Sequence, residues 1–203
     1  MTLSSLNLKC VTNIKGLTIM FKINEKVVYP GHGVAVVEEV VEKFVAGNNI
    51  KFFRLRFLCK EMTVLVPVNN APHMAIRYLN SKEEVTRILN KLSEAPERQL
   101  ANLDFTPSGW NKRNKDYQLK IQGGELVDLA RVYRELMFVS KQKELSFGEK
   151  SLLQLIEDLI AQEIEVVTIS NRDEVLRQIR SPFKEYVSFP SGKGVQQTSS
   201  SSV

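Results

Sequence analysis

The sequence predicts an α+β protein of two domains, in which a small Tudor- or SH3-like β-barrel precedes a compact all-α helical bundle. Two patterns indicate this division: short valine-rich or alternating segments fill residues 21–67, and amphipathic segments with helix caps follow Pro67. The composition, with 43% hydrophobic and 25% charged residues, is typical of a folded globular chain. A length of 203 residues is enough for two small domains.

The first region contains four segments with the residue content of β-strands. They are Lys26–Tyr29, Val34–Val41, Lys51–Leu58 and Met62–Val66. Pro30, Gly31 and Gly33 mark a turn after the first segment, and Gly47 begins a hairpin connection. Strands this short and closely spaced predict a twisted barrel too small to enclose a pocket. Such a barrel still offers an edge strand to a partner.

The second region has the caps and stripes of helices. Ser81 and Glu84 form a capping box that opens the first of them. Residues 93–108, which include Pro96 and Pro107, are interpreted as a short helix and a connector between the domains. Four further helices are expected near Ser108–Gly123, over Glu125–Ser140, from the capping box at Ser146–Glu149 onwards, and over Asn171–Arg180. Their short loops predict antiparallel neighbours in a compact bundle.

These patterns divide the chain into five segments. They are a disordered extension at 1–19, a β-domain at 20–72, a helical connector at 73–108, a helical domain at 109–182 and a flexible tail at 183–203. The first segment has no continuous apolar stretch, so a secretory signal is not expected. No apolar run reaches the roughly 18 residues that cross a bilayer, so no membrane contact is expected either.

No catalytic residue, metal site or cofactor is expected, and the protein is interpreted as non-enzymatic. The cysteines and histidines, which are the usual zinc ligands, are isolated. They are Cys10, Cys59, His32 and His73. Phosphate-binding glycine loops and nucleophile elbows are absent, and unpaired cysteines are typical of a cytoplasmic protein. The acidic pairs Glu157-Asp158 and Glu163/Glu165 are expected on the solvated side of a helix.

The most informative local stretch is Trp110 to Lys115. It places the single tryptophan beside Lys112, Arg113 and Lys115 at an expected helix N-terminus. Cations neutralise phosphates, and an aromatic ring can stack on an exposed base or wedge between base steps. A net charge of +5 is compatible with a nucleic-acid partner. The pattern itself leaves two alternatives open, because Trp110 can equally anchor the core and the cations can form an ordinary solvated face.

Four sequence blocks occur in an order that points to one family. They are Val27–Gly33 (VVYPGHG), Val64–Pro67 (VLVP), Trp110–Arg113 (WNKR) and Leu145–Lys150 (LSFGEK). In these blocks, and from Met20 to about Arg180, the chain resembles the CarD/CdnL family of bacterial transcription regulators. A similar Tudor-like module occurs in transcription-repair coupling factors, and the last two blocks separate the two groups. The tail carries no basic AT-hook-like segment, as in the short CdnL type.

The resemblance implies two partners and assigns residues to each. The β-domain would bind the lobe of the RNA polymerase β subunit, through Lys43 and the strand residues Met62, Thr63, Val64 and Leu65. The helical domain would contact promoter DNA, mainly its backbone and minor groove, at the upstream edge of the melted region. Trp110 would be the wedge there, and the phosphate contacts would be Lys112, Arg113, Lys115 and Lys150. The expected outcome is a more stable open complex, formed by a monomer that is cytoplasmic and reaches the nucleoid through polymerase.

Departures from the family pattern touch both surfaces. Leu65 stands where the family has a basic residue, and Lys43 stands where other members have arginine. Phe138 and Val139 fall where some members are basic. An alternative of a different class therefore stays open: an adaptor on RNA polymerase that makes no direct DNA contact and uses Trp110 as a protein-interface hot spot.

Overall fold

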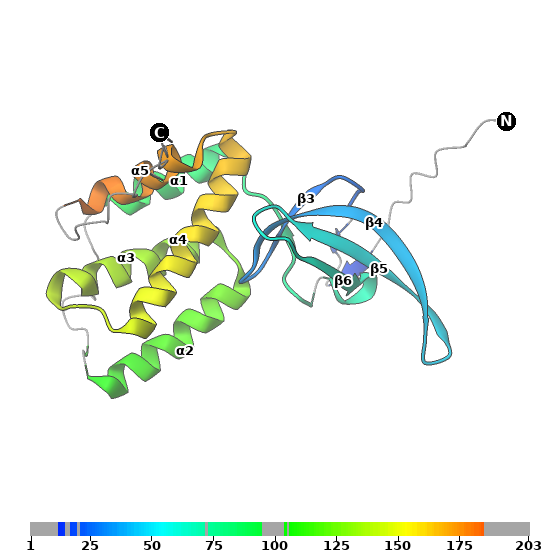
Figure 1. The fold of residues 1–203 in the computed structure, drawn as a ribbon, viewed down its shortest axis with the longest axis horizontal. Helices are drawn as coiled ribbons and strands as arrows, with labels where there is room; N and C mark the ends of the chain where they lie inside the picture. Colours follow the sequence, from blue (N-terminus) through cyan, green and yellow to red (C-terminus); the bar gives the residue numbers. More distant parts are fainter. Residues whose placement is uncertain are drawn as a thin grey trace, which may run out of the picture.

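The computed structural model describes residues 12–14, 17–19, 21–71, 73–94, 104 and 106–184, and it consists of a β-domain and a helical domain placed side by side (Figure 1). The strands are β1 (Thr12–Ile14), β2 (Leu17–Ile19), β3 (Lys26–Tyr29), β4 (Gly33–Val45), β5 (Asn48–Phe57), β6 (Thr63–Pro67) and β7 (Arg77–Tyr78). The α-helices are α1 (Lys82–Ser93), α2 (Pro107–Gly123), α3 (Leu126–Gln142), α4 (Phe147–Thr168) and α5 (Arg172–Arg180). This arrangement confirms the predicted α+β layout of two domains.

The β-domain is built on a five-stranded antiparallel sheet with the order β6-β5-β4-β3-β7. Its central strands are long, and a bulge between Val37 and Glu39 in β4 bends the sheet. One face packs around a hydrophobic core that includes Phe21, Val37 and Phe53. In this order β6 lies at one edge of the sheet. The expected edge strand is therefore present.

A two-stranded ribbon projects from this sheet. β4 and β5 pair as far as Val45 and Asn48, whereas β6 pairs with β5 only over Phe52–Arg56 (Figure 1). The turn at its tip has positive φ at Ala46 and Gly47, as a two-residue hairpin loop demands. The strands are therefore longer than their valine-rich and alternating segments predicted.

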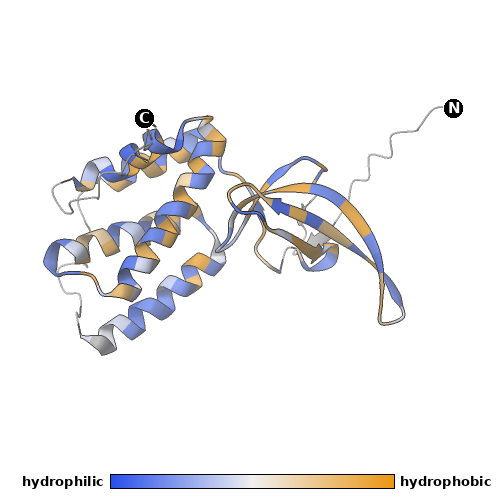
Figure 2. Ribbon diagram, in the orientation of Figure 1, coloured by the Kyte–Doolittle hydropathy of each residue, from blue (hydrophilic) through white to orange (hydrophobic). Residues whose placement is uncertain are grey.

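The helical domain has its own core, to which every one of the five α-helices contributes. α3 and α4 form its centre, with buried residues that include Tyr133, Leu136, Ile156 and Ile160. α2 differs from α3 and α4 in composition, because few of its side chains are apolar and its ribbon is largely hydrophilic in Figure 2. This helix therefore lies at the margin of the domain, attached mainly through Tyr117 and Ile121.

The segment that was interpreted as a connector divides between the two domains. β7 pairs with β3, so the sheet extends to Tyr78. α1 buries Val85, Ile88 and Leu92 in the helical core, because its apolar stripe needs a partner surface. Residues 95–103 and most of the expected N-terminal extension lie outside the described residues, apart from β1 and β2, which pair with each other. Of the expected tail, the described part ends at residue 184.

The two domains meet at a buried carboxylate, Glu163 of α4, whose side chain is 2% exposed. Arg77 of β7 donates from two nitrogens to its two oxygens, each at 2.8 Å, and also to the carbonyl oxygen of Gly124. Asn80 donates to Glu163 Oε1 from its backbone N–H at 3.0 Å and its amide nitrogen at 2.8 Å. Such a bidentate and fully hydrogen-bonded pair fixes geometry, so it sets the orientation of one domain against the other.

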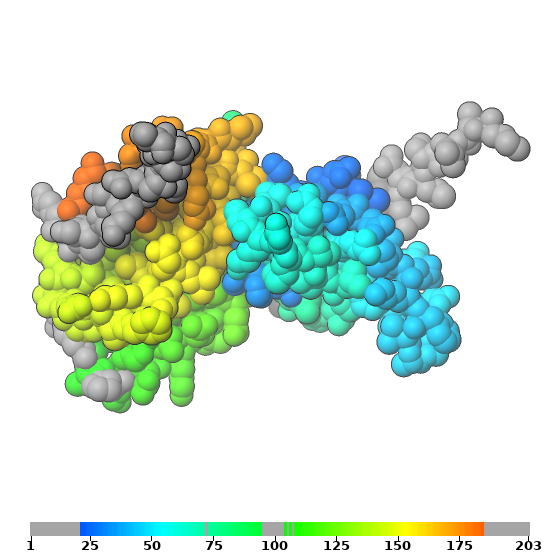
Figure 3. Space-filling model, viewed as in Figure 1, coloured from blue at the N-terminus to red at the C-terminus, as the bar shows by residue number. Residues whose placement is uncertain are grey.

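The turn between β3 and β4 also lies against the helical domain (Figure 3). Gly33 has φ +101°, and a Cβ there would lie 2.0 Å from Gln162 Oε1. Gly124 has φ +70°, and a Cβ there would lie 2.8 Å from Cγ of Pro30. Both positions combine a backbone conformation and a close approach that favour glycine. Pro30 and Gly33 of the Val27–Gly33 block are thus explained by the junction between the domains, whereas Val27 belongs to the core of the β-domain.

The expectation that the acidic pairs of α4 lie on a solvated face was wrong for Glu157 and Glu163. Glu157 is 4% exposed, receives a hydrogen bond from the Tyr133 hydroxyl at 2.8 Å, and pairs with Arg180 at 2.5 Å. Buried carboxylates need such partners. The partner of Glu163 lies 86 residues away in the sequence, so no local pattern could indicate it.

Candidate nucleic-acid interface

The N-terminal ends of α2 and α4 lie next to each other and carry most of the predicted DNA contacts (Figure 1). Thr106 caps α2 by accepting a hydrogen bond from the Gly109 N–H at 3.2 Å, and Pro107 occupies the first helical turn. Ser146 and Glu149 cap α4 with the predicted capping box. Two helix N-termini at one place contribute partial positive charge there, which favours anionic ligands.

Trp110 lies between the core and the surface. Its indole packs against the helical core, with its ring centroid 6.3 Å from that of Tyr117, and a Cβ on Gly148 would lie 3.8 Å from its Cζ2. The side chain is nevertheless only half-buried. Trp110 is therefore compatible both with a role as a core anchor and with a surface contact, since one part of the ring is held by the core and the rest reaches the surface.

Arg113 points inward, unlike an ordinary phosphate-binding side chain. It is 11% exposed, its Nη1 donates to the carbonyl oxygen of Asp104, and its Nη2 lies 3.9 Å from Glu149 Oε1. Two of its nitrogens, Nε and Nη2, are buried without a hydrogen-bond partner among the described residues. This guanidinium is therefore placed to support the first turns of α2 and α4, and little of it is accessible to a ligand.

Glu149 is the carboxylate at the centre of this end of the domain. Burial opposes its ionisation, but hydrogen bonds from Lys143 Nζ at 2.7 Å and from the Ser146 N–H at 2.8 Å lower the pKa of Glu149 below its ordinary value. The charged form is thus the stable one. It balances part of the positive charge that Arg113 and Lys143 bring to the site.

The remaining cations of the site are at the surface. Lys112 and Lys115 are exposed on α2, and neither has an ion pair with any other described residue. Lys150 is also exposed but pairs with Glu144 Oε1 at 2.8 Å, and this contact lowers the pKa of Glu144. An exposed pair of this kind contributes little to stability, and Lys150 can easily exchange Glu144 for another anion. All three ammonium groups can therefore meet phosphates.

The predicted polymerase contacts fall in two places. Met62, Thr63, Val64 and Leu65 lie together at the edge of the sheet, on β6 and the residue before it. Lys43 is exposed on the projecting ribbon, opposite Ile50, and is not part of that edge. The structure thus brings four of the five residues into one surface.

The register shows which backbone groups β6 presents outward. The Phe57 N–H donates to the Met62 carbonyl at 3.0 Å, so hydrogen bonds to β5 alternate along the strand from that pair. Val64 and Val66 then turn their backbone groups toward β5, whereas Thr63 and Leu65 turn theirs away. An added strand would pair with Thr63 and Leu65 regardless of their side chains.

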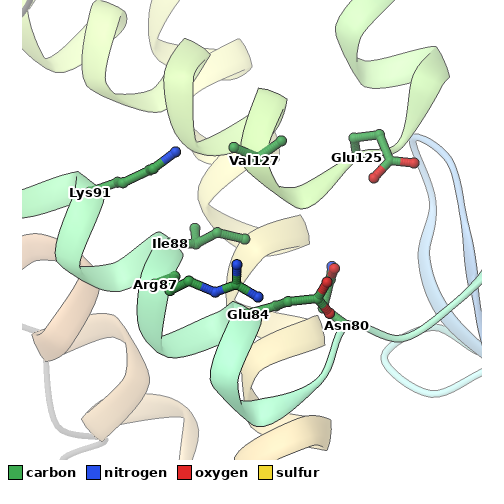
Figure 4. Close-up of a pocket in the computed structure, with 7 residues that line it drawn as sticks. All are labelled: Asn80, Glu84, Arg87, Ile88, Lys91, Glu125 and Val127. Carbon is green, nitrogen blue, oxygen red and sulfur yellow. The ribbon is translucent and has the colours of Figure 1, made fainter.

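Two hollows lined by described residues lack the features of an active site. One, of about 230 Å³, lies between α1 and the start of α3 and is lined by Arg87, Ile88 and Val127 among others (Figure 4). This volume is below the roughly 300 Å³ at which ligand pockets begin. The other lies within the turn between β5 and β6 and contains Cys59, but partial burial and then the carboxylate of Glu165 raise the pKa of that thiol. A thiol with a raised pKa is a poor nucleophile at neutral pH.

The described residues contain no group of three or more histidine, cysteine, aspartate or glutamate side chains that could hold a metal ion. Within the same residues, no helix combines the length and the apolar character that crossing a bilayer requires.

Comparison with known proteins gives matches over both domains. Residues 21–79 match the family model described as the CarD-like/TRCF RID domain, and residues 100–180 match the model described as the CarD C-terminal domain. The chain is also similar to YdeB of Bacillus subtilis, a candidate transcription factor. The two are 28% identical over 148 residues, which make up 73% of this chain and 92% of that protein.

Proposed function

From the premise that the chain belongs to the CarD/CdnL family of transcription regulators, we propose that its β-domain binds RNA polymerase and its helical domain binds promoter DNA. The observation that supports this most directly is the position of Trp110. An aromatic ring is held by the core at a surface with exposed lysines, in a domain that a buried ion pair attaches firmly to a second binding domain. A tethered wedge needs each of these properties.

The proposed contact to polymerase is strand addition at β6. The domain family that residues 21–79 match interacts with the polymerase β subunit. The outward backbone groups of Thr63 and Leu65 can extend a partner's sheet, so the loss of a basic side chain at position 65 removes only part of the contact. Lys43, on the projecting ribbon, then adds a separate electrostatic contact.

The proposed contact to DNA is a wedge with phosphate clamps. Trp110 enters the minor groove at the upstream edge of the melted region, where unstacking a base step costs least. Lys112, Lys115 and Lys150 neutralise nearby phosphates, and Arg113 holds the wedge in place from inside the domain. Because the lysines contact the backbone and the ring contacts a stacking face, this mode reads little sequence.

The result of this mode is a longer-lived open complex. The wedge stabilises the opened state and makes no equivalent contact with closed duplex, so it shifts the equilibrium toward opening. The polymerase contact supplies the high local concentration that a small DNA surface needs.

The test is the lifetime of the open complex on a promoter fragment with cognate RNA polymerase. We expect the protein to lengthen this lifetime and Trp110→Ala to abolish the effect, while affinity for polymerase alone is unchanged. Because Trp110 also packs on the core, Trp110→Phe is the matched control for folding, and the helix content of each variant is checked by circular dichroism. A polymerase-bound wild-type protein that leaves the lifetime unchanged would contradict the wedge and favour the adaptor.

A further inference from the structure

Phe147 is an apolar side chain with no structural role in the fold. It is 88% exposed, although it stands at the first residue of α4. The capping box there is formed by Ser146 and Glu149, so Phe147 does not contribute to it. Leaving a phenylalanine in water forgoes the stabilisation that burial would provide. The position therefore holds a residue that packing and capping do not explain.

Its place in the fold is beside Trp110. Gly148, the next residue, is the one whose Cβ would contact the tryptophan ring at 3.8 Å. One aromatic ring at this end of the domain is thus held by the core, and a second, almost entirely in solvent, stands one residue from the point where the first one rests.

The charges around Phe147 favour a nucleic-acid partner. Lys150 follows it by three residues and so lies on the same side of α4, while Lys112 stands on the first turns of the neighbouring helix. The partial positive charge of two helix N-termini adds to these ammonium groups. An exposed ring with a lysine on the same side of its helix suits a base or sugar flanked by phosphates, although Glu144 now pairs with that lysine.

A protein partner would call for a different surface. Protein interfaces rest on a contiguous apolar patch with few charges at its centre. In the described part of the helical domain, the other large apolar side chains exposed to a similar degree are Leu119 and Ile169. Ile169 terminates α4 at its opposite end, so it cannot extend a patch around Phe147.

We propose that Phe147 is a second aromatic contact to nucleic acid, stacking on a base or sugar next to the step that Trp110 enters. This inference rests on the proposed function, because it places Phe147 in the same DNA-binding surface. The packing gives the two rings different roles. Trp110 is rigid and opens the step, whereas Phe147 is free to rotate and covers a base that the opening exposes.

The experiment measures open-complex lifetime with Phe147→Ala, Phe147→Leu and Phe147→Tyr, each beside the wild-type protein and Trp110→Ala. Stacking on one base corresponds to at least about a fivefold effect, so Phe147→Ala should shorten the lifetime by about that factor. Phe147→Leu keeps the apolar volume without the ring and should recover only part of the loss. Phe147→Tyr keeps the ring and should act like the wild type.

The matched control is Ile169→Ala, which removes an equally exposed apolar side chain from the other end of the same helix and should leave the lifetime unchanged. If Trp110→Ala shortens the lifetime and Phe147→Ala does not, the second contact is refuted and the proposed function stands. If neither variant has an effect, the proposed function itself fails. A loss of polymerase affinity in the absence of DNA, specific to Phe147→Ala, would overturn the inference in favour of a protein contact.

Discussion

The two ends of α4 each bury a glutamate, and the two carboxylates meet their arginines in different ways. Glu149 at the start of the helix and Glu163 near its end are both 2% exposed, and each faces an arginine from another element. Glu163 and Arg77 form two hydrogen bonds of 2.8 Å, with Asn80 completing the set. Glu149 and Arg113 approach only to 3.9 Å, and Nε and Nη2 of Arg113 have no hydrogen-bond partner among the described residues.

This difference indicates different tasks for the two ends. A bidentate buried pair has one geometry, so the end at Glu163 joins the domains as a rigid unit. The contact between Arg113 and Glu149 is longer, and it lies under the proposed DNA-binding surface. The arginine contact is thus tight at the junction between the domains and longer under the proposed DNA-binding surface.

The largest expected effect comes from breaking the junction. Arg77→Met leaves the Glu163 carboxylate buried without its cation, so unfolding free energy should fall by about 3–5 kcal/mol, measured by urea denaturation. Arg172→Ala, which removes the more exposed pairs with Asp158 and Glu165, is the control and should cost about 1 kcal/mol. The double variant Arg77→Met/Glu163→Leu should regain part of the stability. Equal losses for Arg77→Met and Arg172→Ala would show that the junction is not special.

A smaller effect is expected at the other end of the helix. Glu149→Gln keeps the shape of the capping side chain but removes the charge that Lys143 and Arg113 face. Because Lys143 is partly exposed and can turn to water, the loss should be about 1–3 kcal/mol by the same measurement. A cost as large as that of Arg77→Met would mean that the two clusters are equally rigid and would break the comparison.

Ionisation of Glu149 makes the stability of the fold depend on pH. Its pKa is lowered in the folded protein from an ordinary value of 4.5, so its ionised form stabilises the fold at neutral pH. That contribution is complete above the unfolded-state pKa and is lost as pH falls through the lower folded-state pKa. The stability difference between wild type and Glu149→Gln should therefore shrink on acidification below pH ~4.5, in urea titrations at a series of pH values. A difference that stays constant down to pH 3 would contradict this assignment.

Local signals in the sequence were sufficient for most helices and strands. The caps at Ser81, Ser146 and Asn171 lie where the residue types predicted them, because a cap depends on neighbours within four residues. The strand Lys26–Tyr29 has the bounds that its composition predicted. The two-residue strand β7 was missed, because it is too short to show a period and forms only by pairing with β3.

The residues of the candidate site could be named from the sequence, but their arrangement could not. The stretch from Trp110 pointed to a candidate surface, but the inward orientation of Arg113 depends on Glu149 in another helix. The half-burial of Trp110 likewise depends on Gly148 and Tyr117, which allow the ring to rest on the core. Contacts between residues distant in sequence decide which cation of a basic stretch is free, and no spacing rule contains that information.

The smallest expected change in stability is that of the exposed lysines, and it distinguishes them from the buried Arg113. Lys112→Ala should change unfolding free energy by less than about 0.5 kcal/mol, because the side chain is exposed and forms no ion pair with other described residues. It should nevertheless weaken DNA binding by the polymerase-bound protein and reduce the salt dependence of that binding by about one ion. Arg113→Ala should lower the unfolding free energy but leave the salt dependence of DNA binding nearly unchanged, since its guanidinium already faces protein groups.

The two variants are compared by measuring their DNA affinities over a range of salt concentrations. If both variants reduced the salt dependence equally, Arg113 would have to leave Glu149 when DNA binds, and the cluster at the start of α4 would be a part of the interface that rearranges.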